Sequence, residues 1–150
     1  MHRTARGCFG LDDHHKVRSD WEDGRRLRGW VARTDEINLL TAAYGNVFGE
    51  KVPLPPVNPS FDFVVPNDGS LPLDGAVPSI INRRGKPRAM AAIADLDARL
   101  ESVTLEHPDP VTIRALYQEL KVDRAPQVVN GSRLRYRALI KTPAGSKELT

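Results

Sequence analysis

The stretch Gln-Val-Val-Asn-Gly-Ser-Arg-Leu-Arg-Tyr-Arg-Ala-Leu-Ile occupies residues 127–140 and decides the fold that the sequence predicts. Its apolar side chains recur at every second position, the period of a strand with one buried face. Asn130 and Gly131 form a dipeptide that favours a tight hairpin turn, so the stretch predicts a β-hairpin. The apolar face of this hairpin comprises Leu134, Tyr136, Ala138 and Ile140. The polar face comprises Arg133, Arg135 and Arg137.

Two helices are expected before this hairpin. After Pro87, apolar residues spaced three or four apart predict a first helix that runs to Val103. The sequence His107-Pro-Asp-Pro then breaks the chain, and Asp109 is expected to cap a second helix with Pro110 in its first position. Residues 87–141 are therefore expected to form a helix-helix-hairpin core. The first stripe comprises Met90, Ile93, Leu96, Leu100 and Val103; the second comprises Ile113, Leu116, Tyr117 and Leu120.

The N-terminal part predicts an arm, a small hairpin and a helix. Residues 1–14 lack apolar periodicity and are expected to form the arm. Alternation on both sides of Asp23-Gly24 favours a hairpin within residues 15–33. A helix that begins with the capping box Ser19-Asp-Trp-Glu22 stays open as the alternative. Residues 15–48 thus hold the hairpin and a helix.

The helix within residues 34–45 is expected to begin at Thr34 and to end at Gly45. An extended connection rich in proline and glycine follows over residues 49–86, with a polyproline-like part from Val52 to Pro59. Within it, Phe61 to Val65 is a short strand candidate, and Pro66-Asn67-Asp68-Gly69 is a turn. Residues 142–150 are expected to form a C-terminal tail. The predicted class is α+β: a small domain with two C-terminal helices packed on a β-hairpin, plus the N-terminal hairpin, helix and extended proline-rich arm.

Composition and charge narrow the possible functions. The chain has 150 residues, which suits one ordinary domain, and its 40% hydrophobic and 27% charged residues exclude disorder of the whole chain. It holds 22 Lys and Arg against 19 Asp and Glu. Residues 121–150 hold seven cations and two anions, so the basic excess lies at that end. No apolar run approaches the length of a membrane span, and no secretory signal is recognisable. The single cysteine, Cys8, suits a reducing compartment. We therefore expect a protein of the cytoplasm, or of a particle assembled there.

The arginine face of the predicted hairpin is the sharpest candidate site. Guanidinium groups at alternate strand positions lie roughly 7 Å apart, close to the spacing of phosphates along a nucleic-acid strand. Two helices followed by a basic hairpin resemble a winged helix-turn-helix. Lys121 at the place of the usual turn glycine, and Pro126 in the would-be recognition helix, depart from that motif. The expected contacts to an anion or an acidic partner are Arg133, Arg135, Arg137, Arg124, Lys141, Arg83, Arg84, Lys86 and Arg88. The expected apolar anchors for a partner are Trp21, Trp30, Phe61 and Phe63.

Catalytic and metal-binding patterns are weak in this sequence. The run Asp12-Asp13-His14-His15 has suitable ligand atoms, but adjacent side chains diverge, and no second pair at ligand spacing completes a set. The expectation is no catalytic residue, no metal and no cofactor. The predicted function is a non-catalytic structural or adaptor subunit of a large assembly, with a phage particle as one setting; the alternative is a winged-helix-like DNA- or RNA-binding protein. The expected partners are copies of the chain, other protein subunits or nucleic acid, without a membrane or small-molecule substrate.

Overall fold

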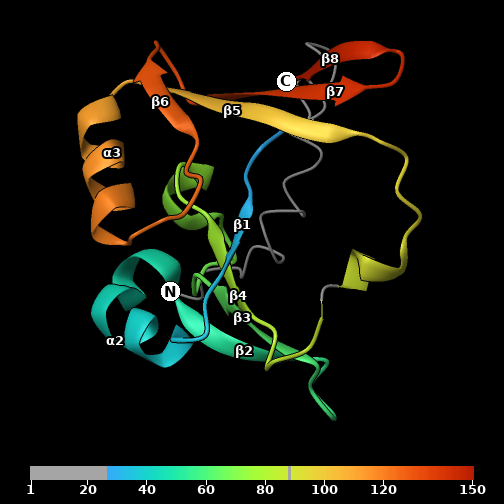
Figure 1. The fold of residues 1–150 in the computed structure, drawn as a ribbon. Helices are drawn as coiled ribbons and strands as arrows, with labels where there is room; N and C mark the ends of the chain where they lie inside the picture. The colour runs from blue at the N-terminus through green and yellow to red at the C-terminus, as the bar shows by residue number, and fades with distance from the viewer. Residues whose placement is uncertain (1–26, 88) are drawn as a thin grey trace. The chain divides into compact units, whose positions relative to one another are not determined.

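The computed structural model describes residues 27–87 and 89–150, which fall into two compact units. Unit 1 comprises Gly29–Ala92, and unit 2 comprises residues 27–28 and Ile93–Thr150. Each unit contains one four-stranded sheet and, among the described residues, one α-helix (Figure 1). The predicted arm and most of the predicted N-terminal hairpin lie outside the described residues, so the choice between hairpin and helix stays open there. The five-part division of the chain also stays a prediction.

Unit 1 follows the element order β-α-β-β-β. Its sheet has the strand order β1-β4-β3-β2, in which β1 runs parallel to β4 and the other neighbours are antiparallel. Two 3-10 turns complete the unit, η2 (Pro72–Gly75) and η3 (Ala89–Ala92). The regular elements are β1 (Val31–Arg33), α2 (Ile37–Phe48), β2 (Glu50–Leu54), β3 (Phe61–Val65) and β4 (Ser79–Asn82).

Helix α2 packs on one face of this sheet. Val64 and Ile80 are cross-strand neighbours on β3 and β4, and both are buried. The two ends of α2 contribute buried Ile37 and Phe48. Lys51 lies on the same face as Val64, and its Nζ donates to Asn38 Oδ1 of α2 at 2.7 Å. Since side chains alternate along a strand, this places α2 on the Val64 face of the sheet.

The boundaries of α2 differ from the prediction. Thr34 does not cap the helix; its Oγ1 accepts from the Glu36 backbone N–H at 3.1 Å, and helical geometry begins at Ile37. Gly45 does not end it either, because the helix kinks at Tyr44 and continues to Phe48. Gly49, with φ +89°, is the residue that stops it.

Unit 2 builds its sheet in the order β6-β5-β7-β8. Strands β5 and β6 are parallel, and helix α3 crosses between them. As predicted, Asp109 caps α3: its Oδ1 accepts from the Thr112 N–H at 3.2 Å, with Pro110 in the first turn. Leu105, Val128 and Tyr136 form a buried row across three strands, and α3 adds buried Ile113 and Tyr117. The elements are β5 (Arg99–His107), α3 (Pro110–Glu119), β6 (Gln127–Asn130), β7 (Arg135–Thr142) and β8 (Gly145–Leu149).

The predicted hairpin at Asn130-Gly131 is wrong. Strands β6 and β7 do not pair with each other, because β5 lies between them. Gly131 continues the parallel pairing, donating its N–H to His107 O at 3.2 Å. A Cβ at this position would lie 2.7 Å from Glu106 Cβ. Glycine is therefore required at position 131 by the close approach to β5. The true hairpin joins β7 to β8, and its turn and strand β8 lie within the predicted C-terminal tail.

The predicted first C-terminal helix is also wrong. Asp97 has φ +57° and donates its backbone N–H to Asp95 Oδ1 at 2.8 Å, a side-chain-to-backbone turn that competes with helix. Arg99 then clamps Asp95 with contacts of 2.8 and 2.6 Å, which holds the pKa of that carboxyl at about 2. The apparent apolar stripe joined three different parts of the chain: the turn η3, an exposed loop and strand β5. The class of two helices on a hairpin is replaced by two mixed sheets.

The predicted extended connection, residues 49–86, contains three strands of the unit 1 sheet. Strand β3 and the turn at residues 66–69 are confirmed, and Gly69 N–H donates to Pro66 O at 2.8 Å. The first three residues of the polyproline-like part, Val52 to Leu54, belong to strand β2, which pairs with β3. Strand β4 was missed, although it lies inside the sheet between β1 and β3. Its partners are distant in the chain, so no local pattern marked it.

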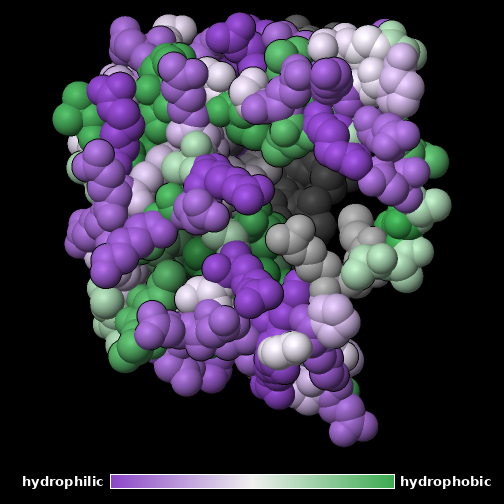
Figure 2. All heavy atoms as spheres, viewed as in Figure 1, coloured by the Kyte–Doolittle hydropathy of each residue, from purple (hydrophilic) through white to green (hydrophobic). Residues whose placement is uncertain are grey.

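The surface mixes polar and apolar side chains. Figure 2 shows hydrophilic residues over most of the visible face, with apolar residues scattered between them. Single exposed apolar side chains of this kind, such as Val57 at 76% exposure, are normal for a folded protein.

Gly49 gives a direct test of this fold. An added Cβ would collide with Val65 O, and the backbone is already left-handed at φ +89°. We expect Gly49→Ala to lower the free energy of unfolding by at least about 1–2 kcal/mol. Urea denaturation measures the change.

Gly45→Ala is the matched control within the same helix. A Cβ at position 45 meets nothing within 4 Å, so the substitution should raise stability by roughly 0.5–1 kcal/mol. Equal effects of the two substitutions would contradict the described end of α2.

Candidate functional site

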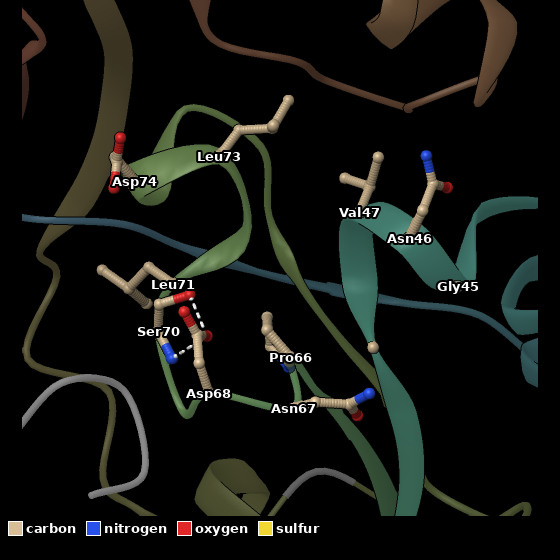
Figure 3. A pocket seen from close by; sticks show the side chains of 11 residues that line it. Gly45, Asn46, Val47, Pro66, Asn67, Asp68, Ser70, Leu71, Leu73 and Asp74 are labelled. Atoms are coloured by element: carbon tan, nitrogen blue, oxygen red, sulfur yellow. Dashed lines mark hydrogen bonds between the residues drawn. The ribbon is translucent and has the colours of Figure 1, made fainter. Parts of the chain in front are cut away.

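A pocket of unit 1 lies between the end of α2 and the loop that follows β3 (Figure 3). We call it the loop pocket. Its volume is about 370 Å³, within the range of small-molecule sites. The residues that line it are Gly45, Asn46, Val47, Gly49, Pro66, Asn67, Asp68, Ser70, Leu71, Leu73 and Asp74.

The loop side of this pocket is fixed by hydrogen bonds within the loop. Asp68 Oδ1 accepts from Ser70 N–H at 3.0 Å and from Ser70 Oγ at 2.6 Å, as Figure 3 shows. The turn at Pro66 and Gly69 closes the preceding bend. These local bonds help to hold the Asp68 and Ser70 side chains in place.

The far wall of the pocket has an unusual backbone. Leu73 and Asp74 both have left-handed dihedral angles, with φ of 45° and 56°, and Gly75 follows with φ +94°. Such conformations are costly for residues with a Cβ and persist only where the surroundings enforce them. The enforcing neighbours are the buried residues Pro72, Gly75, Ala76, Val77 and Pro78. The strained turn thus presents one apolar and one acidic side chain at the surface.

The chemistry of the lining is acidic and amide-rich. Asn46, Asn67 and Ser70 contribute neutral hydrogen-bonding groups, and Asp68 and Asp74 contribute carboxylates. Among the residues that the structure describes, the lining contains no Lys, Arg or His. Val47, Pro66, Leu71 and Leu73 supply apolar surface. An occupant that donates hydrogen bonds, carries a positive charge and has a small apolar part matches these walls best.

A buried ion pair lies elsewhere in unit 1. Asp62 on β3 is 5% exposed and binds Arg84 through two hydrogen bonds, of 2.8 Å from Nε and 2.7 Å from the terminal nitrogen. These hydrogen bonds lower the pKa of the Asp62 carboxyl, against the opposing effect of its burial. Asn82 Oδ1 also accepts from the Arg84 backbone N–H at 2.8 Å. The pair fastens the loop after β4 to the sheet.

Unit 2 has a second hollow between α3 and β6, of about 530 Å³. Arg114 crosses it and donates to Val128 O of the edge strand at 3.2 Å. The Arg114 side chain thus satisfies one backbone carbonyl at the edge of the sheet and covers that part of the edge. The residues that line it are Arg114, Tyr117, Gln118, Ala125, Pro126, Gln127, Val128, Val129 and Asn130.

The predicted basic residues fall into two groups, one in each unit. Arg135 and Arg137 lie on the same face of β7, as the alternation predicted, while exposed Arg133 precedes the strand. Exposed Lys141 is near the end of β7, and Arg124 lies in the turn after α3, 93% exposed beside Asp123. Their role as contacts to anions or acidic partners stays a prediction.

In unit 1 the basic loop is divided by the fold. Arg84 is held by Asp62, whereas Lys86 is exposed and Arg83 is half-buried. Arg88 lies outside the described residues.

The predicted apolar anchors are also only partly described. Phe61 and Phe63 share one face of β3, with ring centroids 6.5 Å apart in an edge-to-face arrangement. Trp30 lies before β1 and is half-buried, while Trp21 is outside the described residues. Their role as partner contacts stays a prediction.

Metal and membrane features were searched in the described part of the chain. No group of three or more His, Cys, Asp or Glu side chains there could hold a metal ion. The candidate ligands Asp12, Asp13, His14 and His15, together with Cys8, lie outside it. No described helix is long and apolar enough to span a membrane.

The fold defines a mixed α/β protein whose two sheets have four strands each, with unit 1 built as a β-α-β-β-β module. Residues 3–121, about four-fifths of the chain, match the family described as Glyoxalase-like domain. The chain belongs to this family. No curated protein and no solved structure matches it.

The family overturns both predicted functions, the assembly or phage subunit and the winged-helix nucleic-acid binder. The fold gives the physical reason for the second correction. Residues 121–126 form a loop in which Lys121 and Arg124 have φ above +50°, so no recognition helix follows α3. Strands β6 and β7 are not a wing, because β5 separates them.

The residues of the loop pocket were missed by the sequence analysis. The turn at residues 66–69 was predicted, but its side chains were not considered as ligands. Asp68-Gly-Ser is typical of an aspartate that binds the backbone two residues on, and Asp74-Gly75 is a turn signal of similar strength. The helix end that completes the pocket has no such signal.

The Asp62–Arg84 pair predicts a pH-dependent stability. The pKa of Asp62 is lower in the folded chain than in the unfolded chain, so the pair stabilises the fold above the unfolded pKa of about 4. This stabilisation is lost as the pH falls through the lower, folded pKa. Arg84→Met should therefore destabilise most at neutral pH, with the difference from wild type shrinking below about pH 4. Urea titrations between neutral and acidic pH measure it.

Arg33→Met is the control for this prediction. Arg33 contacts Asp35 at 3.4 Å, but both side chains are more than half exposed. Its loss should change stability little at any pH. A pH-independent effect of Arg84→Met would rule out the described role of Asp62.

Proposed function

We propose that this glyoxalase-like chain is a binding protein for a small cationic or hydroxyl-bearing molecule, which it holds in the loop pocket. The observation that carries the proposal is the strained Leu73–Asp74 turn, which forms a wall of a pocket whose described lining has two carboxylates and no cation. Strained backbone is maintained preferentially at ligand sites. The family supports a binding domain or an enzyme in general terms.

Charge complementarity defines the expected class of ligand. Asp68 and Asp74 favour an ammonium group, or several hydroxyl groups, over an anion. The Asn46 and Asn67 amides can both donate and accept, which suits a polar ligand carrying both kinds of group. Val47 and Leu73 provide apolar surface in the same pocket, so the part of the ligand that contacts them should be apolar.

The proposed role is binding without catalysis by the described residues. A catalytic acid or base works best with its pKa close to neutral. The carboxyls of Asp62, Asp95 and Asp109 have a lowered pKa, away from neutrality, and each is held by a structural partner: Arg84 on Asp62, Arg99 on Asp95 and Thr112 on Asp109. None of these three lines the pocket.

This proposal differs from the expectation of macromolecular partners alone. That expectation depended on the assembly function, which the family match overturns. Small-molecule binding needs only the pocket and its walls.

The test is a calorimetric titration of the full chain with primary amines, amino sugars and polyols, compared with small carboxylates. Amines or polyols should bind and carboxylates should not. Asp74→Asn should weaken binding at least about tenfold, because it removes one of the two pocket charges. Asp123→Asn, an equal charge change at a 93% exposed side chain, should leave the affinity unchanged.

Two results would contradict the proposal. One is equal affinity of the Asp74→Asn variant and the wild type for every bound compound. The other is consumption of a bound compound during prolonged incubation, followed by NMR, which would make the protein an enzyme.

A further inference from the structure

One face of the unit 2 sheet carries an arrangement that neither the family match nor the loop pocket explains. Two adjacent rows of side chains cross β6, β5 and β7 on the face opposite buried Leu105 and Tyr136. One row is Gln127, Thr104 and Arg137; the next is Val129, Glu106 and Arg135. Strand β7, with both arginines, lies beyond residue 121, where the family match ends.

The two arginines on this face differ in their ion pairing. Arg137 reaches diagonally to Glu106, with a nitrogen-to-oxygen distance of 3.3 Å. Arg135 is directly opposite Glu106 in the β5–β7 register, yet its side chain makes no ion pair or hydrogen bond within the described structure. The carboxylate that faces Arg135 is thus engaged by Arg137, and β8 adds Glu148 to the same face, opposite Leu139.

The free guanidinium is partly withdrawn from water. Arg135 is half-buried, and its Nε is buried without a hydrogen-bond partner; Arg137 Nε is in the same state. Buried donors without acceptors are rare in folded proteins because each costs the loss of its bond to water. An acceptor supplied from outside would remove that cost.

We infer that Arg135 and Arg137 form a binding site for a monocarboxylate. A carboxylate can accept two parallel N–H bonds from one guanidinium, including the one from Nε. A carboxylate matches the planar fork of one guanidinium, whereas a phosphate ester would bring a further negative charge towards Glu106 and Glu148. Thr104 and Gln127 provide a hydroxyl and an amide in the neighbouring row.

Glu106 sets the strength and the charge preference of the site. It is 26% exposed and occupies part of the binding capacity of Arg137, so it limits the site to one added anion. Gly131 approaches it closely, since a Cβ at position 131 would lie 2.7 Å from Glu106 Cβ. A neutral side chain of the same shape at position 106 would leave two uncompensated guanidinium groups.

The experiment is an NMR titration of the full chain with benzoate, following the arginine Nε–H resonances, with phenyl phosphate and benzylamine as comparison probes. Benzoate should shift the Arg135 and Arg137 resonances. Arg135→Gln should weaken benzoate binding at least about tenfold. Arg133→Gln, which removes an exposed arginine outside the strand, should change it less than about twofold. Circular dichroism confirms that each variant is folded.

Glu106→Gln is the second arm of the experiment. It should raise the affinity for phenyl phosphate relative to benzoate, because the site then carries two positive charges. Absence of any Arg135 shift with benzoate, or unchanged binding by Arg135→Gln, would overturn the inference. Tighter binding of phenyl phosphate than of benzoate by the wild type would overturn the assignment to a monocarboxylate. None of these results bears on the loop pocket, which lies in unit 1.

Discussion

Each unit contains one pair of parallel strands, and that pairing controls the rest of its architecture. Parallel neighbours cannot be joined by a tight turn, so the chain must cross over one face of the sheet. In unit 2 the crossing is made by α3 between β5 and β6, and in unit 1 the path from β1 to β4 begins with α2. The helix then buries one face of each sheet. In unit 2 the opposite face carries the polar side chains of Thr104, Glu106, Arg135 and Arg137.

What the sequence could predict follows from how local each signal is. The helix that Asp109 and Pro110 begin was predicted because its cap, first turn and apolar stripe lie within twelve residues of one another. Strand β3 was predicted for the same reason. Strand β4 was not, since its regularity depends on pairing with β1 and β3, which no short window contains.

The errors have a common physical origin as well. Gly131 was interpreted as a turn residue, but here it is needed for space beside Glu106. The stripe from Met90 to Val103 suggested a helix, but Asp95 and Arg99 stabilise a turn within it. The prediction that Arg135 and Arg137 share one face was correct, because side chains at alternate positions of any strand lie on the same face. The loop pocket could not be predicted as a site, because it depends on the kink at Tyr44 and the contact at Gly49 that bring α2 to the loop.

Position 131 links packing to electrostatics. The methyl group of an alanine there would push against Glu106, the residue that balances one of the two arginines on β7. An uncharged substitution of a single hydrogen by a methyl could therefore alter how the sheet face attracts ions. Substitution of this glycine would thus change the affinity of the sheet face for anions without replacing either arginine.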